Sequence, residues 1–168
     1  AKEAFLKASK IAHGAGRKVA LTLSDAFCVD RYRGEFLDLM RSKTVDLIFA
    51  NESELHSLYQ TSDFDTALKQ LAQDVALGVV TRSEKGCAVV SKEAVTLVPA
   101  SRIDTLVDTT GAGDTFCGSL CARIANGDEL TVALRYASAA GALCTTVAGA
   151  VPSIPRREAV ERLLSGTG

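Results

Sequence analysis

The first half of the chain alternates between apolar residues at helical spacing and short, continuous apolar runs. Helical spacing predicts four helices, at 2–13, at 30–41 with Asp30 as N-cap, from near Asn51 onward, and at 65–75. β-Branched and apolar runs predict strands at 18–23, 45–50 and 76–81. Strands that alternate with helices through short loops are typical of parallel βαβ units. The pattern therefore predicts an α/β fold.

From residue 86 the pattern changes. Short apolar runs joined by polar turns predict strands at 87–91, 95–100 and 103–108. A glycine-rich loop then opens a run of helices expected at 114–125, 129–147 and 156–164. With no repeat or low-complexity linker, we expect residues 1–168 to lie in one domain.

The first expected element is a crossover helix with no strand before it, although a βαβ sheet normally begins with a strand. We therefore expect the polypeptide to be a fragment of a longer protein.

Composition excludes several classes of protein. The net charge is −1, which argues against nucleic-acid binding, and no apolar run reaches the roughly 18 residues of a membrane span. The first ten residues have no continuous apolar stretch like that of a signal peptide, so we expect a cytoplasmic protein. The five cysteines are irregularly spaced, without a C-x-x-C pair, and we expect them to be small buried residues. His13 and His56 are isolated and are expected to be structural.

The loop at 108–116 (DTTGAGDTF) carries the most informative chemistry. Gly111 and Gly113 allow a sharp turn that brings backbone N–H groups close to a ligand, and the following helix adds the positive end of its dipole. These features favour a phosphate site. In a site that only binds phosphate, the negative charge of Asp114 would repel the ligand. Its carboxylate fits better as a group that faces a hydroxyl losing its proton while the amides hold the phosphoryl group in transfer.

A bare G-x-G-D would be better explained as a turn with an N-capping aspartate, but the longer string is specific. It resembles the second signature of the PfkB, or ribokinase-like, carbohydrate and nucleoside kinases. Asn51-Glu52-Ser53-Glu54 matches the family's N-x-x-E motif, and Thr81 to Gly86 (TRSEKG) resembles its T-x-G-x-x-G nucleotide loop. The stretch from Gly149 to Ser153 resembles the segment after the nucleotide-binding helices. The similarity covers the whole chain, but only the carboxy-terminal half of such a kinase.

The resemblance implies a ribokinase-like three-layer α/β/α sandwich with a mostly parallel central sheet, of which this chain is the nucleotide-binding portion. It implies that Asp114 is the catalytic base and that Gly111, Ala112 and Gly113 line the anion hole. The implied ATP contacts are Asn51, Thr81, Arg82, Ser83, Glu84, Lys85, Gly86, Gly113 and Ser138. Glu54 would act on Mg²⁺ through water. A monovalent cation such as K⁺ would lie at Asp108, Thr110, Cys144, Val147, Gly149 and Ser153.

Two of these assignments have simpler alternatives. Asn51 could be only the N-cap of its helix, with Glu54 a solvated helix residue. The turn at 82–86 could be an ordinary hairpin connection.

The chain departs from the family pattern in two ways. Ser83 stands where the nucleotide loop usually has glycine, so the local turn could differ. The amino-terminal half, which in the family supplies most substrate contacts and a lid that often mediates dimerisation, is absent. We therefore expect this chain alone to be inactive, and a homodimer to form, if at all, through the missing lid.

The expected activity is transfer of the γ-phosphate of ATP to a hydroxyl of a sugar or nucleoside, with a slight resemblance to bacterial adenosine kinases. Two alternatives remain: a non-catalytic nucleotide-binding module of the same fold, and a vitamin kinase of the same superfamily. The intact Asp114 argues against the first alternative, and the D-T-T-G-A-G-D motif argues against the second.

Overall fold

The computed structural model describes residues 2–166, which fall into two compact units. The first unit comprises residues up to 82 together with 88–97, and the second comprises 83–87 together with residues from 98 onward. The expectation of one domain over 1–168 stays a prediction.

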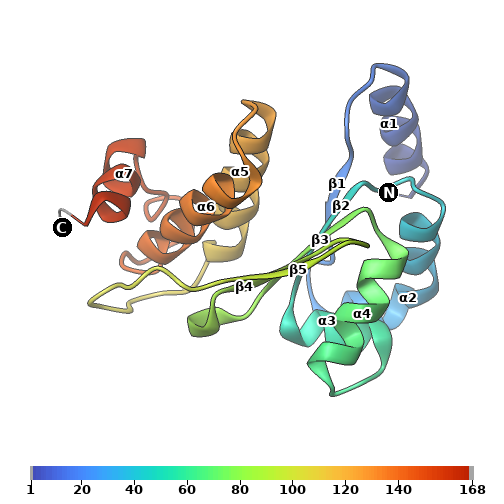
Figure 1. The fold of residues 1–168 in the computed structure, drawn as a ribbon, viewed down its shortest axis with the longest axis horizontal. Helices are drawn as coiled ribbons and strands as arrows, with labels where there is room; N and C mark the ends of the chain where they lie inside the picture. Colours follow the sequence, from blue (N-terminus) through green and yellow to red (C-terminus); the bar gives the residue numbers. More distant parts are fainter. Residues whose placement is uncertain (1, 167–168) are drawn as a thin grey trace. The chain divides into compact units, whose positions relative to one another are not determined.

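Helices and strands follow the predicted order (Figure 1). The helices are α1 (Lys2–Gly14), α2 (Ala26–Arg41), α3 (Glu52–Tyr59), α4 (Phe64–Asp74), α5 (Ala112–Ala125), α6 (Leu130–Cys144) and α7 (Arg157–Ser165), with a short 3-10 helix η1 (Ser83–Lys85). The strands are β1 (Ala20–Thr22), β2 (Leu47–Asn51), β3 (Leu77–Thr81), β4 (Cys87–Val90) and β5 (Val95–Val98). This order confirms the predicted α/β class.

The strands form one sheet in the order β1-β2-β3-β4-β5. β1, β2 and β3 are parallel, with Thr22 opposite Phe49 and Asn51 opposite Thr81. The connections at 82–86 and 91–94 are too short for a parallel crossover, so β4 and β5 continue the sheet in antiparallel fashion. The sheet is therefore mixed, with its parallel part in the first unit.

The core of the first unit lies between these strands and the helices that connect them. α3 contacts β2 and β3 as well as α2 and α4 (Figure 1). Residues 47–50 of β2 are all buried, which explains why the strand reads as a continuous apolar run. The largest fully buried side chains here are Leu23, Met40, Ile48, Leu55, Leu58 and Leu71. Their burial is the main force that holds the unit together.

The predicted start of α2 is wrong. The helix begins at Ala26, and Asp25 is its N-cap, with a carboxylate that accepts from the Cys28 N–H at 2.8 Å. The Asp30 carboxylate instead accepts from the Ser57 hydroxyl. Asp25 and Asp30 are both of a residue type that caps helices, and the chain uses the earlier one. Tyr32, with φ −120° and ψ 23°, makes a kink inside the helix.

The second unit is built on its three long helices. α6 contacts both α5 and α7. Ala139 and Ala140 of α6 pack with Val160 of α7, surrounded by partly buried side chains such as Leu143 and Leu163. Gly141 lies where an added Cβ would come within 3.3 Å of the Ala112 carbonyl oxygen, so the small residues of α6 allow α5 to approach closely.

The predicted strand at 103–108 is wrong, because this segment has no regular structure. Leu106 and Val107 are exposed, by 67% and 54%. The N–H groups of Val107 and Asp108 both donate to the Thr145 carbonyl at the end of α6, and not to a strand. β-Branched and apolar residues favour strands only where a neighbouring strand can pack with them.

None of the five cysteines, all of which lie within residues 2–166, forms a disulfide. Cys87 and Cys144 are buried, as predicted, whereas Cys28, Cys117 and Cys121 are only partly buried. Burial raises the pKa of the Cys87 thiol to about 11, so this side chain behaves as a small apolar residue.

Among residues 2–166, no helix combines the length and the apolar character that crossing a membrane requires.

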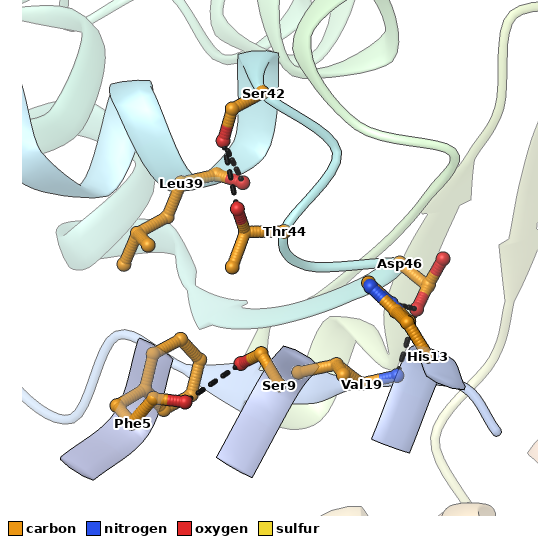
Figure 2. Close-up of polar contacts among 8 residues, drawn as sticks. All are labelled: Phe5, Ser9, His13, Val19, Leu39, Ser42, Thr44 and Asp46. Carbon is orange, nitrogen blue, oxygen red and sulfur yellow. Dashed lines mark hydrogen bonds and ion pairs between the residues drawn. The ribbon is translucent and has the colours of Figure 1, made fainter. Parts of the chain in front are cut away.

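Asp46 anchors α1 to the sheet (Figure 2). Its Oδ2 accepts from the Val19 N–H at 2.7 Å and lies 2.9 Å from His13 Nε2, at the end of α1. Burial acts to raise the pKa of Asp46, but the hydrogen bonds from Val19 and His13 outweigh it, and the pKa lies below its ordinary value. His13 therefore has the structural role that was expected of it.

We predict that Asp46→Asn lowers the free energy of unfolding of the complete protein by about 1 kcal/mol at neutral pH. The folded protein binds the Asp46 proton less readily than the unfolded chain. The contribution of Asp46 is therefore fully present above the ordinary pKa of 3.8, and it is lost as the pH falls through the lower folded-state value. Urea unfolding at a series of pH values checks this.

Asp38→Asn is the control, because Asp38 is an exposed carboxyl on α2 of the same unit. If Asp46→Asn and Asp38→Asn changed stability equally at every pH, the anchor would contribute nothing.

Candidate functional site

Polar side chains gather at the carboxyl edge of the parallel strands in the first unit. β1 is followed by Asp25, β2 ends at Asn51, and β3 ends at Thr81, with Arg82 next in the chain. Carboxyl ends of parallel strands meet at one edge of a sheet, where α/β proteins bind their ligands. Of the predicted site residues, Asn51, Glu54, Thr81 and Arg82 are brought to this edge.

Asn51 and Glu54 form a reciprocal capping box at the start of α3. The Asn51 side-chain oxygen accepts from the Glu54 N–H at 2.8 Å, and Glu54 Oε2 accepts from the Asn51 N–H at 2.9 Å. Glu54 Oε1 also accepts from the Asn51 side-chain nitrogen at 2.7 Å. Asn51 is therefore the N-cap of α3, and this local role exists beside any ligand contact.

The alternative that Glu54 is a solvated helix residue is wrong, because only 5% of it is exposed. Burial raises the pKa of this carboxyl, the Asn51 N–H partly offsets that effect, and the negative charge of Asp25 raises the pKa further. A cation or its hydration shell would relieve this buried charge. Sequence reasoning missed Asp25, although an acidic residue shortly after a strand and at the start of a helix is a usable signal.

The Arg82 side chain is held by two neighbours. Its Nε and one terminal nitrogen donate to the two Glu52 carboxylate oxygens at 3.1 and 3.3 Å. Its guanidinium carbon lies 3.6 Å from the centre of the Phe64 ring. Neither partner was expected from the sequence.

The rest of the TRSEKG loop belongs to the second unit. Ser83 has φ 51° and Gly86 has φ 89°, and the Gly86 N–H donates to the Ser83 carbonyl at 3.0 Å. Ser83 therefore adopts the left-handed conformation that glycine favours. A Cβ at Gly86 would lie 2.0 Å from the Val98 carbonyl oxygen, so no other residue fits there without movement. Glu84 and Lys85 are exposed.

The DTTGAGD loop forms the start of α5. Gly111 is the N-cap with φ 81°, and no side chain caps the helix. The Ala112 N–H donates to the Thr109 carbonyl at 3.2 Å. Within residues 2–166 the N–H groups of Gly113 and Asp114 have no hydrogen-bond partner. These two groups and the helix dipole are suited to an anion.

The Asp114 side chain is exposed in the first turn of α5, so the alternative that it is merely an N-cap is wrong. It lines a hollow of about 620 Å³ together with Gly111. The hollow follows one face of α5 through Gly118 and Ala122 and reaches Arg157 at the start of α7. Asp114 thus borders an open space, and it lies in the same helical turn as the N–H groups of Gly113 and Asp114.

Asp108 latches this loop to the segment after α6. Its carboxylate accepts from the Thr110 N–H at 2.9 Å and from the Gly149 N–H at 2.8 Å. Hydrogen bonds from the Thr110 side chain, the Gly149 amide and the Thr110 amide lower the pKa of Asp108 to about 2. Asp108 is therefore a carboxylate at any physiological pH.

Two other residues predicted for a monovalent cation, Cys144 and Ser153, lie close to this latch. The Cys144 thiol donates to the Thr110 carbonyl at 3.7 Å and lies 3.1 Å from the Ser153 hydroxyl. Ser153 is buried and also bonds to the Ala150 carbonyl. Val147 is 45% exposed. The backbone and hydroxyl oxygens here are ligands suited to a hard cation.

Ser138 of α6 lies beside the chain that follows β5. Its hydroxyl accepts from the Ser101 N–H at 3.3 Å and donates to the Pro99 carbonyl at 3.5 Å. Its contacts in the second unit are therefore structural, and a nucleotide contact stays a prediction.

Comparisons with known proteins confirm the resemblance read from the motifs. The model of the family described as pfkB family carbohydrate kinase matches residues 1–157. A rice (Oryza sativa subsp. japonica) protein named fructokinase-2 is 36% identical over 132 residues, which are 73% of this chain and 39% of that protein.

Solved structures confirm the ribokinase-like fold. An adenosine kinase from Sinorhizobium meliloti is 41% identical with a TM-score of 0.90, over 98% of this chain and 50% of that one. A ribokinase from Arabidopsis thaliana, solved with ribose and ATP, is 28% identical with a TM-score of 0.80, over 95% of this chain and 51% of that one. The chain thus spans about half the length of these structures, or less for the rice relative.

The loop geometry predicts different effects of substitution at its two left-handed positions. Ser83→Gly should leave the stability of the complete protein unchanged within about 1 kcal/mol, because glycine accepts this conformation but gains entropy in the unfolded chain. Gly86→Ala should lower it by about 2 kcal/mol or more, because the methyl group meets backbone. Thermal unfolding measures both.

Gly127→Ala is the control, since Gly127 also has positive φ (86°) but its Cβ would have open space. Equal losses in Gly86→Ala and Gly127→Ala would contradict the role of the Val98 contact.

Proposed function

Because the chain belongs to the pfkB family of carbohydrate kinases, we propose that the complete protein transfers the γ-phosphate of ATP to a hydroxyl of a sugar or nucleoside. The observation that carries this proposal is the start of α5. There Asp114 lines a hollow and lies in the same turn as the N–H groups of Gly113 and Asp114, which have no hydrogen-bond partner among residues 2–166.

The proposed reaction is an in-line phosphoryl transfer. The acceptor hydroxyl oxygen bonds to the γ-phosphorus, its proton passes to an Asp114 carboxylate oxygen, and the bond between the γ-phosphorus and the ADP oxygen breaks. The free N–H groups of Gly113 and Asp114 stabilise the negative charge on the phosphoryl oxygens. Gly111 and Ala112 shape the turn, with the Ala112 N–H engaged by Thr109. A positioned base of this kind contributes about 10²–10⁴-fold in rate.

Mg²⁺ would be held on the first unit at Asn51 and Glu54. The buried Glu54 carboxylate, whose pKa is raised by burial, fits a role in which it accepts hydrogen bonds from the water shell of the metal. When bound, Mg²⁺ neutralises charge on the phosphates. Asp25 adds a second negative charge to this environment.

The nucleotide would be bound by Thr81 and by the loop up to Gly86. The left-handed turn at Ser83 and the close approach at Gly86 give the loop a fixed shape, and the exposed Lys85 supplies a positive charge. Ser138 is a further nucleotide candidate. That a related ribokinase was solved with ATP supports this choice of phosphate donor.

We place K⁺, or a similar monovalent cation, at the latch formed by Asp108, Thr110, Cys144, Val147, Gly149 and Ser153. The permanently charged Asp108 and the carbonyl and hydroxyl oxygens beside it support this assignment. Such an ion would stiffen the loop that carries the anion site.

The acceptor is a small molecule, and its binding residues are expected mainly outside this chain. Relatives named fructokinase, ribokinase and adenosine kinase support a sugar or nucleoside and do not separate the two. Inactivity of the isolated chain, a homodimer formed through the lid half and a cytoplasmic location are parts of the same proposal.

We predict that Asp114→Asn in the complete protein lowers kcat by at least about 100-fold and leaves ATP affinity nearly unchanged, because the amide cannot take the proton. The assay offers adenosine, ribose and fructose as acceptors, and ATP binding is measured separately. Unchanged turnover would discard Asp114 as the base.

The control is Asp104→Asn, which removes an exposed carboxylate from the same unit. If the parent bound ATP but phosphorylated none of the acceptors, a non-catalytic nucleotide-binding module would be favoured.

We further predict that Asn51→Ala and Glu54→Gln raise the Mg²⁺ concentration that gives half-maximal activity by about tenfold or more. Asn51→Ala also removes a helix cap, worth about 1 kcal/mol. Asp63→Ala is therefore the matched control, because Asp63 caps α4 by accepting from the Thr66 N–H at 2.6 Å. Equal Mg²⁺ titrations in the Asn51 and Asp63 variants would leave Asn51 with capping alone.

A further inference from the structure

We infer that Arg82 is a positioning residue: paired with Glu52 and stacked on Phe64, it fixes the Asn51–Glu54 box against the end of β3 and does not contact ATP phosphate itself. This inference rests on the proposed function and assigns a role to one side chain of its nucleotide loop.

The Arg82–Glu52 pair has the geometry of a structural clamp. Two nitrogens of one guanidinium meet two oxygens of one carboxylate, an arrangement that fixes orientation as well as distance. The side chains are only 20% and 29% exposed, so the pair is partly protected from solvent screening. Long surface pairs in open solvent lack this rigidity.

Phe64 supports the guanidinium from its flat face. A distance of 3.6 Å from the guanidinium carbon to the ring centre is a close cation–π contact. The Phe64 ring is in turn met edge-on by the His56 ring of α3, with the ring centres 6.4 Å apart. Glu52 thus occupies the edge of the Arg82 guanidinium, and the Phe64 ring covers one of its faces.

The contacts of Arg82 connect three secondary-structure elements. Glu52 is the first residue of α3, next to Asn51, and Phe64 is the first residue of α4. Arg82 follows directly after the last residue of β3. One side chain therefore ties the end of a strand to the starts of two helices, which contact each other (Figure 1).

Without the clamp, fewer contacts would fix the position of Thr81 relative to Asn51. The parallel register pairs the two residues, and the Thr81 hydroxyl donates to the Ala50 carbonyl at a long 3.4 Å. Asn51, proposed to act on the water shell of Mg²⁺, and Thr81, proposed to bind the nucleotide, are the two members of this pair. A shift of about 1 Å between such groups is enough to weaken a catalytic arrangement substantially.

A direct contact between Arg82 and phosphate would require a different arrangement. The guanidinium would have to leave both Glu52 and Phe64, and the released Glu52 carboxylate would then repel the phosphate. In the clamp the two charges neutralise each other locally. The two roles therefore predict opposite effects of removing Glu52.

The test uses Arg82→Ala, Glu52→Ala, the double variant and the charge exchange Glu52→Arg with Arg82→Glu, all in the complete protein. If Arg82 is a positioning residue, each single variant raises KM for ATP by about 5- to 20-fold with a smaller change in kcat. The double variant is no worse than either single one, because both remove the same interaction, and the exchange recovers part of the loss.

The opposite pattern overturns the inference. If Arg82 contacts phosphate, Arg82→Ala raises KM for ATP, Glu52→Ala leaves it unchanged or lowers it, and the charge exchange is the weakest binder of all. Simple additivity of the two single variants would also overturn it, because residues that act as a pair are not additive.

Arg41→Ala is the matched control. Arg41 makes the same two-pronged bond to Asp74, at 2.8 and 3.2 Å, but it joins the last residues of α2 and α4. It should change thermal stability and leave KM for ATP unaltered. An equal rise in KM in Arg41→Ala would mean that any loss of stability produces the effect, and the positioning role would fall.

Failure of the inference is distinguishable from failure of the proposed function. A parent protein that neither binds ATP nor phosphorylates an acceptor overturns both. A parent that is active, with the Arg82 and Glu52 variants moving KM in opposite directions, overturns only the positioning role.

Discussion

A helix leaves the N–H groups of its first turn without partners, and the way each helix of this chain satisfies them determines what its start can do. α2, α3, α4 and α6 begin with a side chain that accepts from an N–H in the first turn. α5 begins at Gly111 with no such side chain. Its free N–H groups therefore remain available to a ligand, at a point where a carboxylate and a hollow lie beside them.

The same constraint explains the other half of the site. Asn51 caps α3 with its side chain, and Glu54 returns the bond, so the box is rigid before any ligand arrives. The structural and the functional interpretation of Asn51 are therefore compatible. Burial of Glu54 then leaves a charge that its hydrogen bonds only partly stabilise, which favours a cation nearby. Arg82 extends this preorganisation from α3 to β3.

The loop at 81–86, proposed to bind the nucleotide, shows how a departure from a family pattern can preserve geometry. Ser83 replaces the usual glycine and still has a positive φ, because the turn is imposed by the neighbouring bond from Gly86 to the Ser83 carbonyl. At Gly86 no such replacement is available, since backbone from Val98 fills the space of a side chain. Position 86 thus accepts only glycine without movement of the backbone, whereas position 83 accepts a residue with a side chain.

The order of the helices, the five strands and the loop that carries Asp114 could all be predicted from local patterns in the chain, because periodicity and glycine placement are local properties. The prediction failed at 103–108, where apolar residues resemble a strand but find no partner strand, and at Asp30, because the earlier Asp25 is the N-cap of α2. The pairing of Arg82 with Glu52, the burial of Glu54 and the latch from Asp108 to Gly149 join residues distant in sequence or depend on burial. These features could be found only in the folded molecule, because contacts across 30 or 41 positions leave no periodic trace in the sequence.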